Sequence, residues 1–459
     1  MKIFNLISKP ENTFLIFALF FGLLFVVLTP PFQVPDEPEH FYKMYGFTEG
    51  SLTFKKLENE AGQILPQSMV ELGKQYKRMA FHPNVKTSKK EITESLSRKL
   101  EKNDKVFLVY SPTAYTPISY TPQFLILWFM KLVNINPLWM LYILRICSLF
   151  LYTGLIYTAI KTIPFRKWLF TLISTLPMSL YMASGVSTDG LTMGLCFIFI
   201  AYVLRLALNK EINKLTKKDW IIFAALISLI TICKFAYLPL IFMYFMIPKE
   251  KFKSKNLRLK YFWILLGINT FYVLAFLFTT IHLSQGLNLD YQDLSINKFD
   301  LIKSILKHPI HYMNSIFATI VEYSGEHLET LIGRLGWFDT LLPSSLISTY
   351  TFLLISTSVC DTGKEATDID YSAKNKFIGF AIYFTVLTII LTSIHVLYNR
   401  ELPAIWGLQG RYLLPVFPLF CLFCSVKRLQ CKYLPLLIIT CSIVLMCITF
   451  TNMLERFYG

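Results

Sequence analysis

The sequence predicts an all-α polytopic membrane protein, a bundle of about 11 transmembrane helices with a long first external loop. Hydrophobic residues make up 54% of the 459 residues and charged residues 16%, where soluble proteins carry about 25% charge. The mean hydropathy is +0.49, and 40 Phe and 25 Tyr exceed what one soluble core could bury. These values exclude a soluble enzyme, a disordered protein and a secreted disulfide scaffold.

The net charge of +16 does not indicate a nucleic-acid-binding protein. The basic residues lie in short loops between apolar runs, which is the positive-inside pattern of membrane proteins. None of the nine Cys falls in the long polar loop 31–113. We therefore expect no disulfide framework outside the membrane.

The first apolar run, residues 12–29, follows Lys2 and Lys9. No small-x-small cleavage site follows it, so we predict an uncleaved first transmembrane helix with the N-terminus inside. Residues 31–137 then form an external loop that carries surface or re-entrant helices. The whole chain, 1–459, reads as one integral-membrane domain.

The later apolar runs are joined by short loops whose basic residues set the orientation. Four loops rich in Lys and Arg should face the cytoplasm: 161–167, 209–219, 248–260 and 426–432. The runs themselves lie at 138–160, 168–183, 188–208, 220–247, 258–281, 341–359, 377–398, 411–425 and 433–451.

Two segments need a special path to satisfy this orientation. If residues 114–132 spanned the membrane, loop 161–167 would face outside, so we predict a surface or re-entrant helix there. Residues 220–247 have basic loops at both ends, so they should enter and return as two half-length helices. The turn falls near Lys234 and Pro239, which places Lys234 at the bottom of an outward-facing cavity. The C-terminus is then outside.

The densest acidic sequence, PPFQVPDEPEHF at 30–41, comes directly after the first run. Its prolines restrict the backbone, and they hold Asp36, Glu37, Glu39 and His40 near the membrane surface. One interpretation is a solvated loop start. The other is a general base or metal ligand held next to a lipid-borne substrate.

These residues resemble a known superfamily. Asp-Glu just after the first transmembrane helix is similar to the first-loop acidic motif of the GT-C glycosyltransferases, membrane enzymes that use polyprenyl-phosphate-linked sugars. Arg145 followed by TLPMSLYMASGVSTDG at 175–190 resembles the oligosaccharyltransferase pattern, with Asp189 as the second acidic site. Lys234, shortly before Ala-Tyr-Leu-Pro at 236–239, resembles the Lys-x-Pro turn of the aminoarabinose and mannosyl transferases.

Four motifs together resemble a bacterial family of GT-C-like multi-pass membrane proteins of unassigned function. They are PDEPEHF at 35–41, YTPISYTPQ at 115–123, GRLGWFDTLLP at 333–343 and QGRYLLPVFP at 409–418. The resemblance implies GT-C helices over 138–281, a second external loop over 282–340 and C-terminal transmembrane helices over 341–459.

The resemblance also implies roles for individual residues. Asp36 is the expected base that deprotonates the acceptor hydroxyl, with Glu37 second. Asp189 would position the acceptor or a divalent ion. The candidate cations for the carrier phosphate are Arg145, Lys234, Arg334 and Arg411, and the other candidate substrate-binding residues are His40, Trp337, Gln409 and Tyr412. For Arg145 and Arg411 the alternative is snorkelling to lipid headgroups.

We expect no resident metal. His308 and His311 with Glu322, Glu326 and His327 could share helix faces as metal ligands, but an amphipathic surface helix explains them better. The sequence identifies no cofactor with certainty, and a divalent cation is possible.

The function that follows is an inverting glycosyltransferase on the outer face of a bacterial cytoplasmic membrane. Its partners would be a polyprenyl-phosphate-linked sugar donor of the undecaprenyl type, a cell-surface polysaccharide or lipid-linked glycan as acceptor, and membrane lipid, without nucleic acid. The alternative is a transporter or flippase, or a polymerase, for lipid-linked sugars. A transporter should show two interrupted segments in matching halves, and we find one.

Overall fold

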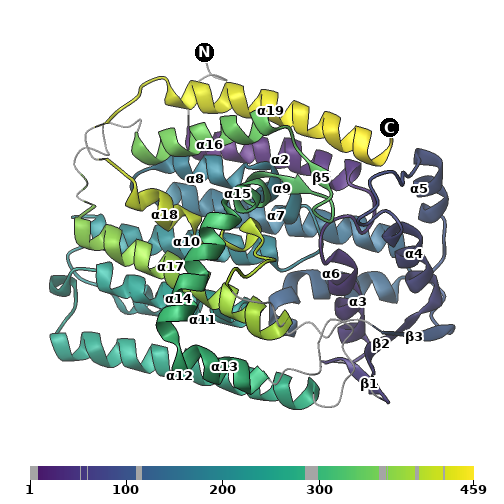
Figure 1. Cartoon of the computed structure of the whole chain (residues 1–459), viewed down its shortest axis with the longest axis horizontal. Coiled ribbons are helices and arrows are strands. Elements are labelled where there is room, and N and C mark those ends of the chain that lie inside the picture. The colour runs from purple at the N-terminus through teal and green to yellow at the C-terminus, as the bar shows by residue number, and fades with distance from the viewer. Residues whose placement is uncertain are drawn as a thin grey trace.

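The computed structural model describes residues 9–51, 53–58, 60–109, 116–284, 298–360, 369, 371–398, 403–426 and 429–459. Most of the long helices run side by side along the long axis of the molecule, and a smaller group of helices and strands gathers at one end, at the right of Figure 1. The C-terminus lies toward that end. This arrangement matches a membrane bundle with one large extramembrane part.

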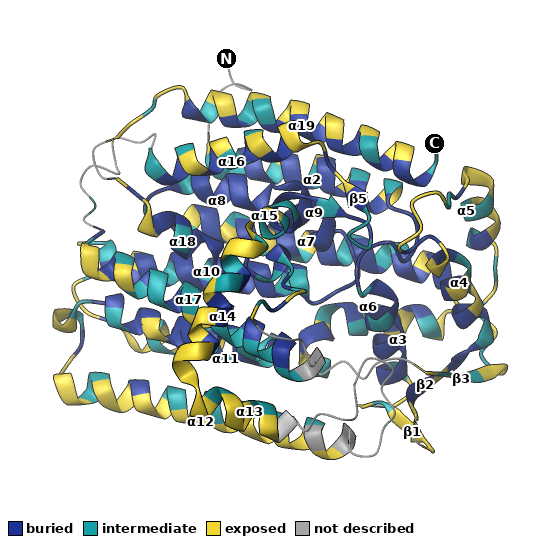
Figure 2. Cartoon of the chain, viewed as in Figure 1, coloured by how far each residue is buried: buried dark blue, intermediate teal, exposed yellow. Residues whose placement is uncertain are grey.

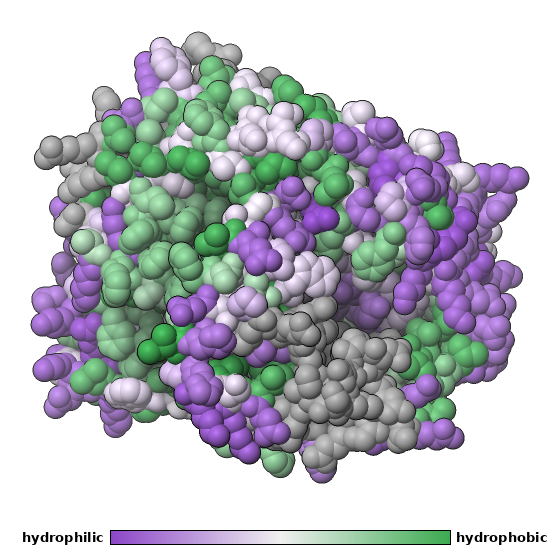
Figure 3. All heavy atoms as spheres, viewed as in Figure 1, coloured by the Kyte–Doolittle hydropathy of each residue, from purple (hydrophilic) through white to green (hydrophobic). Residues whose placement is uncertain are grey.

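Six described helices are long and apolar enough to cross a membrane. They are α2 (Pro10–Leu28), α7 (Pro137–Thr162), α10 (Asp189–Leu208), α12 (Lys255–Ser284), α17 (Ala373–Tyr398) and α19 (Leu434–Phe457). Figure 3 shows hydrophobic residues over the bundle and hydrophilic residues gathered toward its two ends. The spans that hydropathy predicts at these places are therefore confirmed as helices.

The other predicted crossings are short or broken. The run 168–183 forms two helices, α8 (Lys167–Ser174) and α9 (Pro177–Ala183), because Pro177 has no N–H to continue α8. The run 411–425 forms η5 (Gly410–Tyr412) and α18 (Phe417–Phe423), and α16 (Ser344–Val359) has 16 residues. The described residues therefore do not confirm the predicted count of about 11 transmembrane helices.

The segment predicted to enter and return does so. Helix α11 (Lys217–Cys233) ends at Lys234, whose backbone is extended, and the 3₁₀ helix η2 (Phe235–Met246) follows. The two ends meet, since the Leu215 N–H donates to the Lys251 carbonyl at 2.9 Å, beside the short helix η3 (Lys249–Lys251). Lys234 thus lies at the turn, and both basic loops lie on one face.

The segment 114–132 does not form a spanning helix. It contains η1 (Pro117–Tyr120) and α6 (Thr121–Leu132). Twelve residues reach about 18 Å at 1.5 Å per residue, which is short of a bilayer core. Helix α6 packs on α3 (Glu37–Thr48) and on α7, as a surface or re-entrant helix would.

The loop predicted to be external contains a small β-sheet that the all-α prediction does not include. Strands β1 (Lys55–Leu57), β2 (Glu60–Pro66) and β3 (Lys105–Val109) pair antiparallel in that order. Helices α4 (Gln67–Lys77) and α5 (Lys89–Leu96) accompany them. The chain as a whole is mostly helical, as predicted, and this part adds a small amount of sheet.

The described part of the region predicted as the second external loop is helical with one hairpin. It comprises α13 (Lys298–Lys307), α14 (Pro309–Glu322), α15 (Ser324–Ile332) and the paired strands β4 (Arg334–Leu335) and β5 (Thr340–Leu341). In Figure 2 the central helices α7 and α10 are largely buried, whereas α12 and α13 expose most of their surface. Exposed apolar side chains on such outer helices are suited to contact lipid.

The C-terminus lies on the face that carries the 31–113 loop. Helix α19 ends at Phe457, whose carbonyl accepts the Thr87 N–H at 2.9 Å. The Tyr458 hydroxyl donates to the Leu28 carbonyl at the end of α2 at 3.2 Å. Since α2 begins at Pro10 on the opposite face, the start of the first span and the C-terminus lie on opposite faces, as predicted.

Candidate functional site

The candidate site begins at the turn between α2 and α3. Asp36 precedes the first residue of α3 and has φ 63°, in the left-handed region. Such a conformation is uncommon for residues with a side chain, although Asp tolerates it better than most. The turn directs the Asp36 carboxylate to a partly open position, with 46% of the side chain exposed.

The neighbouring carboxylate, Glu37, is fully buried with Arg145. The Glu37 oxygens accept from Arg145 Nε at 2.8 Å, from Arg145 Nη2 at 2.6 Å and from the Val186 N–H at 3.0 Å. The other three N–H donors of Arg145 bind the carbonyls of Val26, Thr29 and Pro30. Every donor of the guanidinium is therefore used inside the protein.

This burial changes two of the predicted roles. Glu37 presents no surface to a substrate, so it does not fit a second base. Arg145 neither snorkels nor reaches a phosphate, because Glu37 and the three carbonyls enclose it. The pair instead fixes the end of α2, the start of α3 and the loop before α10 against α7.

Four other charged residues form a second cluster in which positive and negative charges alternate. Arg411 donates to Asp36 Oδ2 at 2.6 Å and to Asp189 Oδ2 at 3.3 Å. Lys234 forms an ion pair with Asp189 Oδ1. Asp36, Arg411, Asp189 and Lys234, here called the central cluster, come from four distant parts of the chain. All four are predicted site residues, and the structure brings them together.

Arg411 is the centre of this cluster, with 2% of its side chain exposed. Its Nε donates to Gln409 Oε1 at 2.7 Å and its Nη2 to the Tyr412 hydroxyl at 3.3 Å. The guanidinium also lies over the Tyr412 ring at 4.9 Å and the Phe338 ring at 5.3 Å. The QGRY residues therefore act as a unit that orients one arginine.

His40 lies beside the central cluster. Its Nδ1 is 2.5 Å from the Tyr120 hydroxyl, in the YTPISYTPQ sequence. Burial lowers the pKa of His40 to about 4, and the charges of Asp36 and Asp189 oppose that shift. The imidazole is therefore neutral near pH 7 and serves as a hydrogen-bonding group, not as a cation.

Two further ionisable groups of α3 accompany His40. Burial lowers the pKa of Lys43 to about 7 and raises the pKa of the Glu39 carboxyl above its usual value. Lys43 follows His40 by three residues, which places the two on one face of α3. That spacing is visible in the sequence, but Lys43 is not among the residues predicted for the site.

A cavity adjoins the inner side of the central cluster. Asp189, Gly190, Tyr237 and Arg411 line it together with Ser179, Met182, Thr192, Met193, Leu414 and Pro415. Its volume is ≈ 10 Å³, which is room for about one water molecule. Any ligand larger than water must therefore approach the cluster from the exposed side of Asp36.

The hairpin β4–β5 covers one side of the cluster. Phe338 contacts Arg411 as described, and the Trp337 Nε1–H donates to the Phe32 carbonyl at 3.0 Å. Arg334 does not reach the cluster through any described contact, since it bonds to the Phe338 carbonyl at 2.9 Å and to Glu326 at 3.3 Å. The hairpin thus brings Trp337 near the turn of Asp36 but leaves Arg334 in a structural position.

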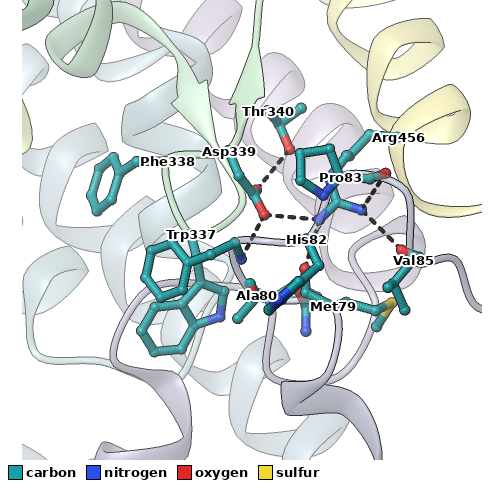
Figure 4. Close-up of polar contacts among 12 residues, drawn as sticks. Met79, Ala80, His82, Pro83, Val85, Trp337, Phe338, Asp339, Thr340 and Arg456 are labelled. Carbon is teal, nitrogen blue, oxygen red and sulfur yellow. Dashed lines mark hydrogen bonds and ion pairs between the residues drawn. The ribbon is translucent and has the colours of Figure 1, made fainter.

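Asp339 joins this hairpin to the end of α19 (Figure 4). Its Oδ2 accepts from Arg456 Nη2 at 2.8 Å and from the Phe81 N–H at 3.0 Å. Arg456 also donates to the carbonyls of Met79, Pro83 and Val85. The sequence does not reveal the pairing of Asp339 with Arg456, because 117 residues separate them and no local pattern connects them.

Backbone strain gathers in the same region. Phe32, Asp36, Phe81 and Phe338 all have φ between 61° and 63°. A positive φ in Phe is unusual and costs about 1–3 kcal/mol, and such residues concentrate at functional sites. The strain supports the central cluster and its rim as the functional region.

The donor groups of the cluster do not fit a divalent ion. Asp36 and Asp189 are the available carboxylates, and both are paired with Arg411, while Lys234 adds a second positive charge beside Asp189. A metal ion there would meet like charge. Among the described residues, no group of three or more His, Cys, Asp or Glu side chains is placed to hold a metal, and this includes the described parts of α13 to α15.

Comparison with known proteins gives one match. A family model with the description "Predicted membrane protein (DUF2142)" matches residues 19–420. No curated protein and no solved structure matches the chain.

Proposed function

The chain belongs to this family of predicted membrane proteins and is a multi-pass membrane protein, and we propose that it is a glycosyltransferase. It would transfer a sugar from an undecaprenyl-phosphate-type carrier to a cell-surface polysaccharide or a lipid-linked glycan. Transfer would take place outside the bacterial cytoplasmic membrane, on the face that carries Asp36. The observation that supports this proposal best is the central cluster, a half-exposed carboxylate held beside two cations at the end of the first span.

The reaction needs a base, and Asp36 suits that role. Arg411 occupies Asp36 Oδ2, and Oδ1 has no hydrogen-bond partner among the residues that the structure describes. In the proposed step, Oδ1 takes the proton of the acceptor hydroxyl as the acceptor oxygen bonds to the anomeric carbon. The bond between that carbon and the phosphate oxygen breaks on the opposite side, so the configuration inverts.

The same step releases a phosphate that carries the departing electron pair. Arg411 and Lys234 place two positive charges at the cluster, and Lys234 keeps 15% of its side chain exposed. Preorganised cations stabilise developing charge without reorganisation cost. Asp189 holds both cations in place in the absence of phosphate and would partly release them when phosphate binds.

Four predicted residues assist in this proposal. Gln409 and Tyr412 orient Arg411, so they are positioning residues. His40, neutral and bonded to Tyr120, is a hydrogen-bonding group beside Asp36. Trp337 lies at the rim, where an aromatic ring could contact a sugar.

The test replaces Asp36 by Asn in a strain that lacks the native gene, with surface glycans analysed by mass spectrometry. We expect the glycan to disappear while the protein inserts normally, because general-base loss costs about 10²–10⁴ in rate. Asp104→Asn, an exposed carboxylate of the same external loop, is the matched control and should keep the glycan.

A second measurement separates the enzyme from the transporter. In the enzyme case, the Asp36→Asn strain accumulates the lipid-linked donor on the outer face. In the transporter case, the donor stays inside, and the glycan returns when donor is supplied from outside. A full glycan profile in the Asp36→Asn strain would refute the role of Asp36 in either process.

A further inference from the structure

A second polar cavity lies at the other end of the bundle from the central cluster. Its volume is ≈ 470 Å³, which is in the range of cavities that hold small ligands. Three helix ends form its wall: the last turn of α7, the first turn of α8 and the last turn of α10. Asp189, which lines the cavity at the central cluster, and Arg205, which lines this one, lie about 24 Å apart along α10 at 1.5 Å per residue, so the two cavities lie near opposite membrane surfaces.

The cavity is lined by four cations. Lys161 comes from α7, Lys167 from α8, and Arg205 and Lys210 from the end of α10. None of these side chains forms an ion pair or hydrogen bond with another residue that the structure describes. They therefore have no direct ionic or hydrogen-bonding partner among the described residues, in contrast to the paired charges of the central cluster.

The two described carboxylates near this wall form no ion pair with its cations. Asp219 caps α11, where its oxygens accept from Thr216 and from the Tyr202 hydroxyl at 2.7 Å. It acts on Arg205 through space only. Glu211 is exposed at the chain surface beside Lys210.

The N-terminus of α8, which forms part of the wall, adds to the positive potential of the cavity. Lys167 is the first residue of α8, and no side chain caps that helix. The first N–H groups of a helix favour an anion, particularly phosphate. A cavity, four cations and an uncapped helix start thus coincide at one place.

We propose that this cavity binds a phosphoryl group at the membrane surface opposite the central cluster. Lys161, Lys167, Arg205 and Lys210 supply the charge. The phosphoryl group belongs either to an anionic lipid headgroup or to a soluble phosphate compound. The remaining wall, with Thr162, Pro164, Leu208 and Asn209 among its residues, is suited to the uncharged part of either ligand. This site is independent of the proposed glycosyl transfer.

The test measures ligand binding to the purified full-length protein in detergent. Native mass spectrometry counts bound dioctanoyl phosphatidylglycerol, with phosphatidylcholine of the same chain length as the zwitterionic control. Calorimetry with inorganic phosphate and with glycerol 1-phosphate tests the soluble source. Phosphatidylglycerol binding without phosphate binding identifies a headgroup site, and binding of all three anions identifies a site for any phosphoryl compound.

Two triple variants with the same charge change separate the cavity from the general basic face. The first is Lys161→Gln, Lys167→Gln and Lys210→Gln. The second is Lys214→Gln, Lys217→Gln and Lys218→Gln, three exposed lysines of the same face that do not line the cavity. We expect the first to weaken phosphatidylglycerol binding about ten-fold or more and the second to weaken it less than about three-fold.

Equal losses of phosphatidylglycerol binding in the two triple variants would overturn the proposal. They would show that the lipid responds to the total charge of the basic face and not to the cavity. An unmodified protein that binds none of the three anions would also overturn it. If the first triple variant fails to fold, Arg205→Gln alone gives the same comparison, since Arg205 is exposed. Unchanged binding in that variant would likewise count against the site.

Discussion

Replacing Glu37 by Gln tests whether Glu37 has a structural role that the adjacent Asp36 does not share. Glu37 and Arg145 have no exposed side-chain surface, and removal of one partner from a buried ion pair costs about 3–5 kcal/mol. In Glu37→Gln, Arg145 keeps its three carbonyl acceptors, so we expect a loss at the lower end of that range. The neighbouring variant Asp36→Asn breaks one bond of a half-exposed side chain and should leave stability nearly unchanged.

Arg145→Gln should be the more damaging change. It leaves the Glu37 carboxylate buried with the Val186 N–H as its described hydrogen-bond donor. It also frees the carbonyls of Val26, Thr29 and Pro30, each of which costs about 1–3 kcal/mol if it stays buried and unpaired. For the same reason, a Glu37→Leu/Arg145→Met double variant should remain destabilised, although apolar replacement of a buried ion pair is often neutral.

The assay is thermal unfolding of the detergent-purified protein, followed as the monodisperse fraction that survives heating. We expect the unmodified protein to have the highest melting temperature and Asp36→Asn to lie close to it. Glu37→Gln should melt at a lower temperature, and Arg145→Gln at the lowest. An unchanged melting temperature in Glu37→Gln, or a lower one in Asp36→Asn than in Glu37→Gln, would refute the reasoning.

Three further predictions concern the central cluster and its rim. Lys234→Gln should raise the requirement for lipid donor roughly ten-fold to a hundred-fold, because a charge-assisted contact to phosphate is worth about 1.5–3 kcal/mol; unchanged donor dependence in a transfer assay would remove Lys234 from the phosphate site. Since the pKa of His40 is about 4 in the folded protein and about 6.5 when unfolded, the unfolded state binds more protons between these values, and stability should fall as pH drops from about 6.5 to about 4. His40→Gln should flatten that pH dependence of the melting temperature, and an identical profile would contradict it. Asp339→Asn should loosen the hairpin from α19, because Arg456 loses its anionic partner in a buried position; faster proteolysis between β4 and β5, with little change in the rest of the bundle, is the expected readout.

Much of the architecture follows from sequence alone, because hydropathy and the distribution of Lys and Arg are local properties. They identify α2, α7, α10, α12, α17 and α19, and they predict that 220–247 returns to its own side at Lys234. Bilayer thickness sets the required helix length, and the cost of moving basic loops across the membrane sets the orientation. The small sheet is not predicted because its strands lie in a polar loop and their pairing is not local. Strand β2 pairs with β3, which begins only at Lys105, and the register places Gly62 opposite Val109 and Pro66 opposite Lys105.

The candidate site, too, is predicted only in part by the sequence. The sequence supplies Asp36, Asp189, Lys234 and Arg411 as candidates, because isolated charges near apolar runs are costly and need a reason. It does not assign partners, since each ion pair joins residues that are far apart in the chain. Only the packing of α2, α3, α7 and α10 decides that Glu37 meets Arg145 in a dry interior while Asp36, one residue earlier, keeps a free oxygen at the surface. A carboxylate that a guanidinium encloses is fixed as structure, and one that retains an exposed oxygen remains able to accept a proton.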